Sequence, residues 1–425
     1  MSTGTRTPRH DSALAKQVAE FCKQHVPATA DKPNFPSSPL WAAVAKAGTS
    51  LWLDTGDIDA AKTLWTREFK ALTTNNTLLN KEVQKGIYDE LVPDAAALVR
   101  GIAKDLDEQG IVLEIGFILN AVHGLKLVRT FGADVSVELH TALANDTEAS
   151  YWYGKRFAAI SPDRFIVKVP LTPAGIFAAR RLVKDGIRVN FTLGFSARQN
   201  FLIGVGARAT WVNVFMGRIN AFVADNKLGD GKNAGEKATI ASQRVLGELG
   251  KQGITVKQIG ASMRSGQQVQ DLVGLDVFTI PTAAAKEFVT KNPPLADIRN
   301  HMGEDPPVTW GPGADAKGDK LDVFWQLDDT FRKAMAELAK ANLDTMTGAD
   351  LMAFLQARGV GDLFPTFTAD EQKKVGAEGK IPVHATWKDK VRAGKASWDG
   401  ILTAAALASF TQDQTALDER IQRLL

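Results

Sequence analysis

Residues 164–193, RFIVKVPLTPAGIFAARRLVKDGIRVNFTL, hold two short apolar runs on either side of a segment of helical length. That segment has Pro173 near its start and Gly186 just past its end, which is the usual order of these two residues in a helix. An apolar run, a helix and a second apolar run together predict a βαβ unit with parallel strands.

The same alternation continues along the chain in both directions. It predicts strands at 50–55, 71–75, 135–140, 164–170, 187–193, 210–215, 256–262 and 276–281. Eight strands over about 230 residues match the size of a (β/α)8 barrel. A doubly wound sheet is the alternative, but it requires a GxGxxG nucleotide fingerprint after the first strand, and none is there. The sequence therefore predicts an α/β protein with a TIM barrel.

The stretches outside the barrel differ in composition. Residues 1–47 predict one or two helices with a proline-rich link, KPNFPSSP. Around residue 295 the chain becomes rich in proline, glycine and charge, and helical patterns follow to residue 425. We expect an N-terminal helical segment at 1–47, a barrel at 48–294, and a linker with a helical extension at 295–425 that packs on the barrel. Trp325, Phe354 and Phe364 give this extension apolar groups to bury, which argues against disorder.

The composition describes an ordinary globular chain of 425 residues, 44% hydrophobic and 23% charged. Its 51 Lys and Arg against 48 Asp and Glu leave no excess to hold a nucleic acid or a membrane surface, so an anion must be bound by a few placed residues. One cysteine, Cys22, excludes an intramolecular disulfide and fits a reducing compartment. The start has no signal-peptide pattern, and no stretch approaches about 18 consecutive apolar residues, so we expect a cytoplasmic protein.

Six predicted strands carry polar side chains. They are Asp54, Asn75, Glu138, Lys168, Asn190 with Thr192, and Asn213. Barrel strands are buried on both faces, so a polar side chain there must be satisfied locally or belong to a site at the carboxyl ends of the strands. For the three asparagines, a satisfied polar group inside the barrel is the alternative.

Lys168 is the most informative of these residues. It lies in the apolar run FIVKVP with no neighbour in sequence to pair its ammonium group. Burial disfavours the charged form of an amine, and a neutral amine can attack a carbonyl group. We interpret Lys168 as a Schiff-base lysine, and a structural ion pair with a carboxylate on another strand is the alternative. Asp54 and Glu138 supply the two carboxylates that proton transfer around an imine requires.

Two arginines follow the sixth and seventh predicted strands, Arg218 in FMGRI and Arg264 in ASMRS. Arginine binds phosphate through two parallel hydrogen bonds, and barrels of this kind bind phosphate near their last strands. We interpret the pair as an anion site, with surface ion pairs as the alternative. His123 and His140 are not spaced as a ligand pair and have no cysteine or third histidine to join, so no metal site is predicted.

The motifs that carry these residues follow one another as in a known family, and residues 48–285 resemble the transaldolase family of Schiff-base TIM barrels. LWLDTGDI resembles its first-strand motif, TTNN its TTNP, VSVELH its glutamate strand and IVKVP its lysine strand. NFTLGFSARQ is similar to N-x-T-x-x-F-S-x-x-Q, VNVFMGRI to SPFVGRI, and IGASMRSG to an ASFRN-type segment. Three residues depart from the pattern, because Asn76 replaces a proline, Asn213 a serine and Ser265 an asparagine.

The resemblance implies a transaldolase of the pentose phosphate pathway, a transferase of carbohydrate metabolism that acts on sugar phosphates and needs neither metal nor cofactor. Lys168 would form the Schiff base, and Asp54 would move the proton of the sugar hydroxyl. Glu138 and Thr192 would hold the catalytic water. The residues that would bind the substrate are Asn75, Asn190, Asn213, Arg218, Ser262 and Arg264, with the two arginines on its phosphate.

Two other functions stay open at this point. One is a Schiff-base aldolase or transferase of the same fold with a different sugar substrate, which the departures at Asn76 and Asn213 allow. The other is a catalytically silent binding barrel, although such a barrel has no physical need for a buried Lys168 and two carboxylates. The regions 1–47 and 295–425 have no counterpart in the family pattern and are candidates for a homo-oligomer contact or a cover over the barrel.

Overall fold

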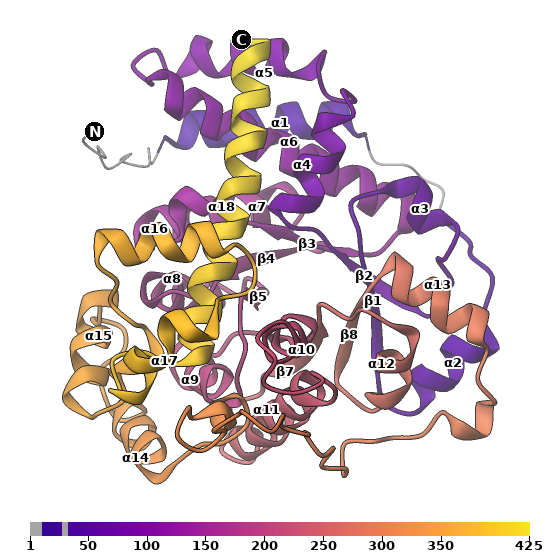
Figure 1. The fold of residues 1–425 in the computed structure, drawn as a ribbon. Coiled ribbons are helices and arrows are strands. Elements are labelled where there is room, and N and C mark those ends of the chain that lie inside the picture. Colours follow the sequence, from indigo (N-terminus) through magenta and orange to yellow (C-terminus); the bar gives the residue numbers. More distant parts are fainter. Residues whose placement is uncertain (1–10, 28–32) are drawn as a thin grey trace.

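The computed structural model describes residues 11–27 and 33–425, and in these residues eight parallel strands close into a barrel in sequence order (Figure 1). The strands are β1 (Ser50–Asp54), β2 (Phe69–Thr73), β3 (Asp134–Glu138), β4 (Phe165–Pro170), β5 (Val189–Thr192), β6 (Trp211–Phe215), β7 (Lys257–Ala261) and β8 (Val277–Pro281). β1 pairs with β8 and closes the ring. All eight predicted strands are present, and the prediction of a TIM barrel is confirmed.

The βαβ unit predicted at residues 164–193 forms as expected from its local signals. Its helix is α8 (Pro173–Lys184), and the Oγ1 atom of Thr172 caps it by accepting the backbone N–H of Gly175 at 2.9 Å. Pro173 occupies the first turn, where a missing N–H costs no hydrogen bond. Gly186 follows the helix with φ 79°, a conformation that favours glycine, and the chain then turns into β5.

Further helices surround the barrel or follow its strands. They are α3 (Ile58–Lys62), α4 (Asn76–Gln84), α5 (Leu91–Ile102), α6 (Glu108–Phe131), α7 (Thr147–Ile160), α9 (Ala197–Ala207), α10 (Met216–Asp225), α11 (Ala234–Gly250), α12 (Gly266–Asp271) and α13 (Thr282–Lys291), with 3-10 turns η1 (Thr141–Leu143), η2 (Leu295–Asp297), η3 (Leu321–Phe324) and η4 (Gly361–Leu363). The connection between β2 and β3 holds α4, α5 and α6, where a simple βα unit has a single helix.

The regions on either side of the barrel are helical in the described residues. Before it lie α1 (Ser12–His25) and α2 (Pro39–Lys46), and after it lie α14 (Asp329–Leu338), α15 (Gly348–Ala357), α16 (Ala369–Glu378), α17 (His384–Arg392) and α18 (Trp398–Leu424). In Figure 1, α18 is the long yellow helix that runs from the level of α17 to the level of α5. Residues 1–10 and 28–32, which include part of the predicted N-terminal segment, lie outside the described residues. The division of the chain at residues 48 and 294 stays a prediction.

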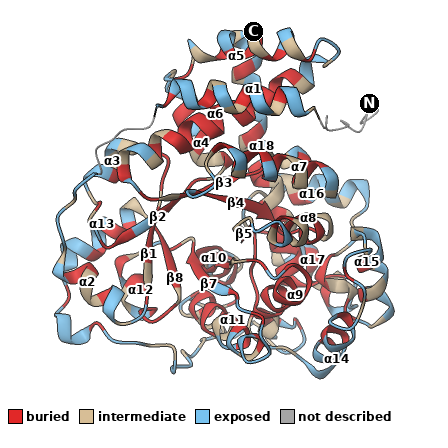
Figure 2. Cartoon of the chain, turned by 180° about the vertical axis from the view of Figure 1, so that it is seen from behind, coloured by how far each residue is buried: buried red, intermediate tan, exposed pale blue. Residues whose placement is uncertain are grey.

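Helix α6 is, within the described part of the chain, the one helix long and apolar enough to cross a membrane by length and composition. In its most apolar window, 83% of the residues are buried inside the protein, and the helix contacts α1, α5, α18 and β3. In Figure 2, α6 lies beside α1 and α5, two of the helices that it contacts. Its apolar surface is therefore used for packing in the core.

The barrel interior is polar at the carboxyl ends of the strands and apolar one layer of side chains further toward their amino ends. Side chains alternate along a strand, so residues two positions apart face the same way. Trp52 therefore lies below Asp54 on β1, and Trp211 lies below Asn213 on β6. The two indole rings pack edge to face with centroids 5.0 Å apart. This apolar floor leaves the polar side chains grouped at the mouth of the barrel.

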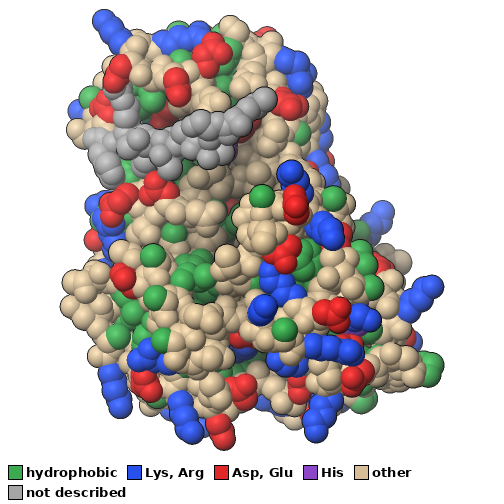
Figure 3. Space-filling model, turned by 60° about the vertical axis from the view of Figure 1, so that its left-hand side comes forward, with side chains coloured by type: hydrophobic (Ala, Val, Ile, Leu, Met, Phe, Trp, Pro, Cys, Tyr) green, Lys and Arg blue, Asp and Glu red, His purple; other side chains and the backbone are tan. Residues whose placement is uncertain are grey.

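The remaining sequence features have simple places in the fold. Cys22 is buried on α1, and burial raises the pKa of its thiol to about 12, which keeps it protonated at neutral pH. Phe364 of the extension is buried, whereas Trp325 and Phe354 are half-buried. On the face in Figure 3, basic and acidic side chains are interspersed without a large area of one sign, as the balanced composition predicts.

Candidate active site

A cavity of about 510 Å³ lies at the carboxyl ends of the strands, within the size range of small-molecule sites. Eight of the ten predicted site residues line it: Asp54, Asn75, Lys168, Asn190, Asn213, Arg218, Ser262 and Arg264. The two that do not line it, Glu138 and Thr192, lie on strands β3 and β5, on either side of the strand that carries Lys168. Residues separated by up to 210 positions in the sequence thus share one space.

Lys168 sits between two polar neighbours because of the strand register. It is paired with Glu138 on β3 and with Asn190 on β5, so the three side chains are at one level of the barrel. The side chain of Lys168 is only 5% exposed, and its Nζ lies 3.5 Å from Oε2 of Glu138 and donates a hydrogen bond to the carbonyl oxygen of Thr74 at 3.0 Å. Lys168 therefore forms an ion pair with a carboxylate on another strand, which was the structural alternative to a Schiff-base role. Its side chain also lines the cavity.

Two oxygen atoms on the strands that flank β4 are buried without a hydrogen-bond partner among the described residues. They are Oε2 of Glu138, which is ion-paired with Lys168, and Oγ1 of Thr192. Thr192 follows Asn190 by two positions on β5 and so faces the barrel interior as Asn190 does. Leaving such atoms unpaired in a protein interior is unfavourable, and a bound water or a substrate hydroxyl would satisfy them. These two oxygens are therefore ready to hold a polar group.

Asp54 is held by a chain of hydroxyl groups from the neighbouring strands. The Oγ1 of Thr73 on β2 donates to Oδ1 of Asp54 at 2.6 Å, and the Oγ1 of Thr279 on β8 lies 2.6 Å from that of Thr73. Because Thr73 uses its hydrogen on Asp54, Thr279 donates to Thr73. Both threonines line the cavity and were missed from the sequence, although Thr279 stands in the apolar run VFTIP and could have been noticed as a polar residue in a strand.

Both carboxyl groups bind protons more tightly than exposed ones. Burial raises the pKa of Asp54, and the nearby charge of Lys168 and the hydrogen bond from Thr73 only partly oppose it. Burial likewise raises the pKa of Glu138 against the opposing effect of Lys168. A carboxyl group with a raised pKa exchanges protons closer to neutral pH, which suits general acid–base chemistry.

The side chains of the three asparagines form hydrogen bonds within the protein, as expected for satisfied polar groups inside the barrel. In the part of the chain that the structure describes, one of their buried polar atoms nevertheless lacks a partner. Nδ2 of Asn190 donates to Oγ of Ser136 at 3.1 Å, and Nδ2 of Asn213 donates to Oδ1 of Asn190 at 3.4 Å. Oδ1 of Asn213 is buried without a partner among the described residues. Asn75 caps α4 by accepting the backbone N–H of Leu78 at 2.8 Å. Asn213 thus combines a structural bond with an acceptor that remains for a ligand.

Arg218 is buried in the first turn of α10, with 7% of its surface exposed. Its guanidinium carbon lies 5.6 Å from the ring centroids of both Phe215 and Phe410, and its Nη1 has no hydrogen-bond partner among the described residues. Burial, with the nearby charge of Arg264, lowers the pKa of Arg218 to about 10, so the group stays charged at neutral pH. A buried cation with an unpaired N–H is suited to bind an anion.

The two arginines meet because α10 begins directly against the end of β7. A Cβ atom at Gly217 would lie 2.1 Å from the carbonyl oxygen of Ser262 and 2.9 Å from Nε of Arg264, so only glycine permits this approach. Ser262 has φ 61°, a conformation that costs free energy in a residue other than glycine and that is concentrated at functional sites. The backbone thus places Arg218, Ser262 and Arg264 around one part of the cavity.

Among the other residues that line the cavity and were not found from the sequence are Lys81, Phe215, Lys380 and Phe410. Lys81 stands shortly after the recognised motif TTNN, and Phe215 lies within the motif VNVFMGRI. Lys380 and Phe410 belong to the C-terminal extension, and no local pattern connects them with the barrel.

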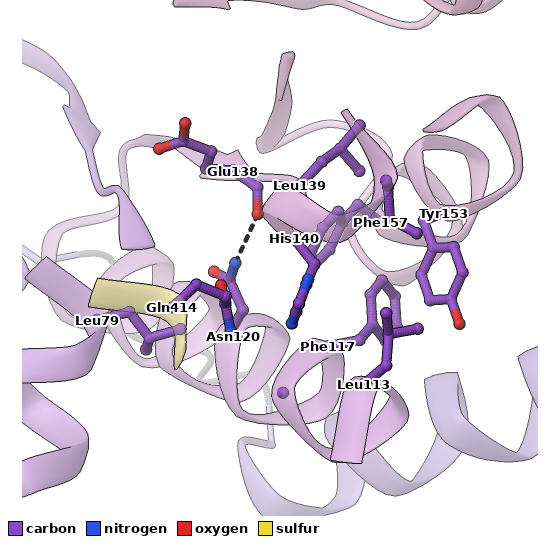
Figure 4. A pocket seen from close by; sticks show the side chains of 12 residues that line it. Leu79, Leu113, Phe117, Asn120, Glu138, Leu139, His140, Tyr153, Phe157 and Gln414 are labelled. Carbon is purple, nitrogen blue, oxygen red and sulfur yellow. Dashed lines mark hydrogen bonds between the residues drawn. The ribbon is translucent and has the colours of Figure 1, made fainter. Parts of the chain in front are cut away.

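A second, small cavity of about 10 Å³ lies behind Glu138, and it has room for about one water molecule. Figure 4 shows the carboxyl group of Glu138 pointing away from the other residues of this cavity, while its main-chain oxygen accepts a hydrogen bond from Nδ2 of Asn120 at 2.8 Å. His140 and Gln414 also line it. This cavity is too small for a sugar, so Asn120 supports the end of β3 rather than a substrate.

Comparisons with known proteins agree with this arrangement. A family model described as transaldolase/fructose-6-phosphate aldolase matches residues 51–341. A transaldolase of Xanthomonas euvesicatoria pv. vesicatoria is 32% identical over 233 residues, which are 53% of this chain and 71% of the relative. A transaldolase of Edwardsiella ictaluri is 28% identical over 321 residues, 71% of this chain and 96% of the relative. Transaldolase A of Pasteurella multocida is 30% identical over 258 residues, 59% and 80% of the two chains. The chain therefore belongs to the transaldolase/fructose-6-phosphate aldolase family.

Proposed function

We propose that this protein is a transaldolase, which moves a dihydroxyacetone unit from a ketose phosphate to an aldose phosphate through a Schiff base on Lys168. The observation that carries the proposal is the buried amine of Lys168, which opens into a cavity also lined by Asp54 and by the arginine pair. Such a reaction belongs to the pentose phosphate pathway, and we expect it in the cytoplasm.

The first half of the reaction joins the sugar to the protein. Lys168 gives up a proton, for which Glu138 at 3.5 Å is the nearby acceptor, and its neutral amine attacks C2 of the ketose. The C2 oxygen then takes up protons and leaves as water, and a protonated imine remains. A water held by Glu138 and Thr192 carries these protons. It would hydrogen-bond to the two buried oxygens of these residues that lack a hydrogen-bond partner among the described residues.

The second half moves the three-carbon unit. Asp54 in its charged form takes the proton of the C4 hydroxyl, and the electrons of the C3–C4 bond pass to the iminium nitrogen, so that an enamine forms on Lys168 and the aldose phosphate leaves. The enamine carbon then attacks the aldehyde of the acceptor, whose oxygen takes the proton back from Asp54. Water hydrolyses the new imine, and the lengthened ketose is released.

The charge of the substrate fits the arginine pair. A sugar phosphate carries between about 1.5 and 2 negative charges at neutral pH. Arg218 has a buried, unpaired N–H that lies among apolar rings, where an anion is not screened by solvent. We assign the phosphate to Arg218 and Arg264, and the sugar hydroxyls to Asn75, Asn190, Asn213 and Ser262.

Borohydride trapping tests the proposal. The protein is incubated with fructose 6-phosphate and sodium borohydride, digested with trypsin and analysed by mass spectrometry. We expect a reduced dihydroxyacetone adduct on Lys168, and because the adduct blocks cleavage there, the labelled peptide should run from residue 165 to residue 180. No adduct on Lys168 with any ketose would contradict the Schiff-base mechanism and favour a silent binding barrel.

A second arm separates transaldolase from a Schiff-base aldolase of the same fold. Fructose 6-phosphate is supplied with erythrose 4-phosphate or glyceraldehyde 3-phosphate as acceptor, and the sugar phosphates are followed by chromatography. Formation of a new ketose phosphate supports transfer. An adduct without transfer to either acceptor would favour the aldolase.

The hydroxyl of Thr73 should set the pH dependence of the reaction. It donates a hydrogen bond to Asp54 and so stabilises the charged form, which the cleavage step requires. Thr73→Val should raise the pKa of Asp54 further, and the acid side of the pH profile of kcat/KM should move to higher pH, by up to about one unit. Thr279→Val should cause a smaller shift in the same direction, because Thr279 acts only through Thr73. An unchanged profile in Thr73→Val would mean that Asp54 is not the base.

A further inference from the structure

Part of the wall of the cavity at the carboxyl ends of the strands comes from residues that lie about a hundred positions or more after the last barrel strand. Lys380 stands in the turn after α16, and Phe410 lies on α18. Both positions fall beyond residue 341, where the match to the family model ends. The barrel motifs therefore do not describe the whole site of this chain.

Helix α18 crosses the mouth of the barrel, and hydrogen bonds hold it to the barrel on both sides of the mouth. The Oγ1 of Thr403 donates to the carbonyl oxygen of Leu193, just after β5, at 2.9 Å. Further along, Asp413 accepts a hydrogen bond from Thr77 in the first turn of α4. Between these two points, Phe410 packs beside Arg218. The extension is thus in direct contact with the arginine that we assign to the phosphate.

The turn that carries Lys380 is tied to the same helix as Arg218. Nδ2 of Asn226, which ends α10, donates to the carbonyl oxygen of Pro382 at 3.0 Å, and its Oδ1 accepts the backbone N–H of His384 at 2.7 Å. Helix α10 therefore presents Arg218 in its first turn, and Asn226, the residue that caps its C-terminal end, holds the segment of Lys380. This arrangement keeps Lys380 close to the cavity without any bond from Lys380 itself.

The side chains that line the cavity carry mostly positive charge. Its basic side chains are Lys81, Lys168, Arg218, Arg264 and Lys380, and its one carboxylate is Asp54. Lys380 is exposed and has no ion pair or hydrogen bond from its side chain among the described residues, so its charge is not neutralised within the protein. An ammonium group on a long side chain at the rim of such a cavity can turn toward an entering anion.

We propose that Lys380 is a third cation of the substrate's phosphate site, which the C-terminal extension adds to Arg218 and Arg264. The assignment rests on the proposed function, because it takes the ligand to be a sugar phosphate. Arg218 meets the phosphate in the buried part of the cavity, and Lys380 neutralises the remaining charge from the solvent side. Lys380 acts in binding and takes no part in the proton transfers.

The test measures the affinity for inorganic phosphate by isothermal titration calorimetry in the full-length protein and in three variants. Lys380→Met removes the charge and keeps the length of the side chain, and Lys380→Arg keeps the charge. Lys374→Met is the matched control, since Lys374 is an exposed lysine of α16 that does not line the cavity. We expect about a 10-fold weaker phosphate affinity in Lys380→Met, near-normal affinity in Lys380→Arg and no change in Lys374→Met. The difference should shrink as salt is added.

The proposal is overturned if Lys380→Met binds phosphate as well as the unaltered protein does, if Lys374→Met weakens binding equally, or if the unaltered protein binds no phosphate. A far-ultraviolet circular dichroism spectrum and a thermal melt of each variant show whether it is folded. The measurement needs no turnover, so its failure is separate from a failure of the proposed function, which would be the absence of a borohydride adduct on Lys168.

Discussion

Replacing Lys168 with methionine is expected to remove the borohydride-trapped adduct and to lower turnover by about 10⁴-fold or more, because no other group can form the covalent intermediate. The variant should still fold. Methionine fills nearly the same volume in β4, and Glu138, whose pKa burial already raises, can take up a proton and remain buried as a neutral acid. Mass spectrometry after trapping, together with a thermal melt, measures both parts of this prediction.

Lys81→Met is the control for the identity of the nucleophile. Lys81 is a second lysine that lines the cavity, but it is exposed on α4, whereas Lys168 is buried in β4. This variant should still be trapped on Lys168. An adduct that persists in Lys168→Met, on Lys81 or on any other lysine, would show that the nucleophile is misassigned.

Replacing Asp399 with alanine should destabilise the protein by about 3–5 kcal/mol, the usual effect of removing one partner of a buried ion pair. Asp399 is 0% exposed at the start of α18 and accepts hydrogen bonds from Nε of Arg198 at 2.8 Å, from its Nη2 at 2.9 Å and from Oγ of Ser196 at 2.6 Å. Without it, Arg198 stays buried with Asp362 as its remaining ionic partner. Urea unfolding followed by circular dichroism gives the change in the free energy of unfolding.

The same pair makes stability depend on pH in a defined direction. Burial acts to raise the pKa of Asp399, but the charge and hydrogen bonds of Arg198 outweigh it, so the pKa is lower in the folded protein than in the unfolded chain. The stabilisation is therefore complete above the unfolded value of about 4 and is lost as the pH falls through the lower folded value. Asp399→Ala should lose less stability than the unaltered protein when both are acidified.

Two controls isolate this effect. Asp370→Ala removes an exposed aspartate of α16 and should leave unfolding unchanged. The double variant Arg198→Met with Asp399→Ala should regain part of the lost stability, since neither charge is then left unpaired in the interior. A double variant as unstable as the sum of the two single ones would mean that the two side chains act independently.

The barrel could be predicted because its signals are local. Each of the eight strands is a short apolar run, and helices such as α8 carry their own start and stop residues, so neither depends on distant contacts. The same local test found Asp54, Lys168 and Asn213, because a polar residue in a buried strand stands out. It missed Thr73, whose hydroxyl reaches Asp54, and Thr279, whose hydroxyl reaches Thr73, because these contacts form only when β2 and β8 flank β1.

By itself, the sequence determined the TIM barrel, the strand that bears Lys168 and the polar residues at the strand ends, because these follow from side-chain periodicity and burial within short segments. Only the tertiary structure decided which distant residues complete the cavity. Phe410 reaches it because α18 crosses the mouth of the barrel, held by the buried pair of Asp399 and Arg198, 201 positions apart. Lys380 reaches it because Asn226 binds the backbone of the segment that follows Lys380. Such contacts arise from the packing of whole elements, and no local pattern of residues records them.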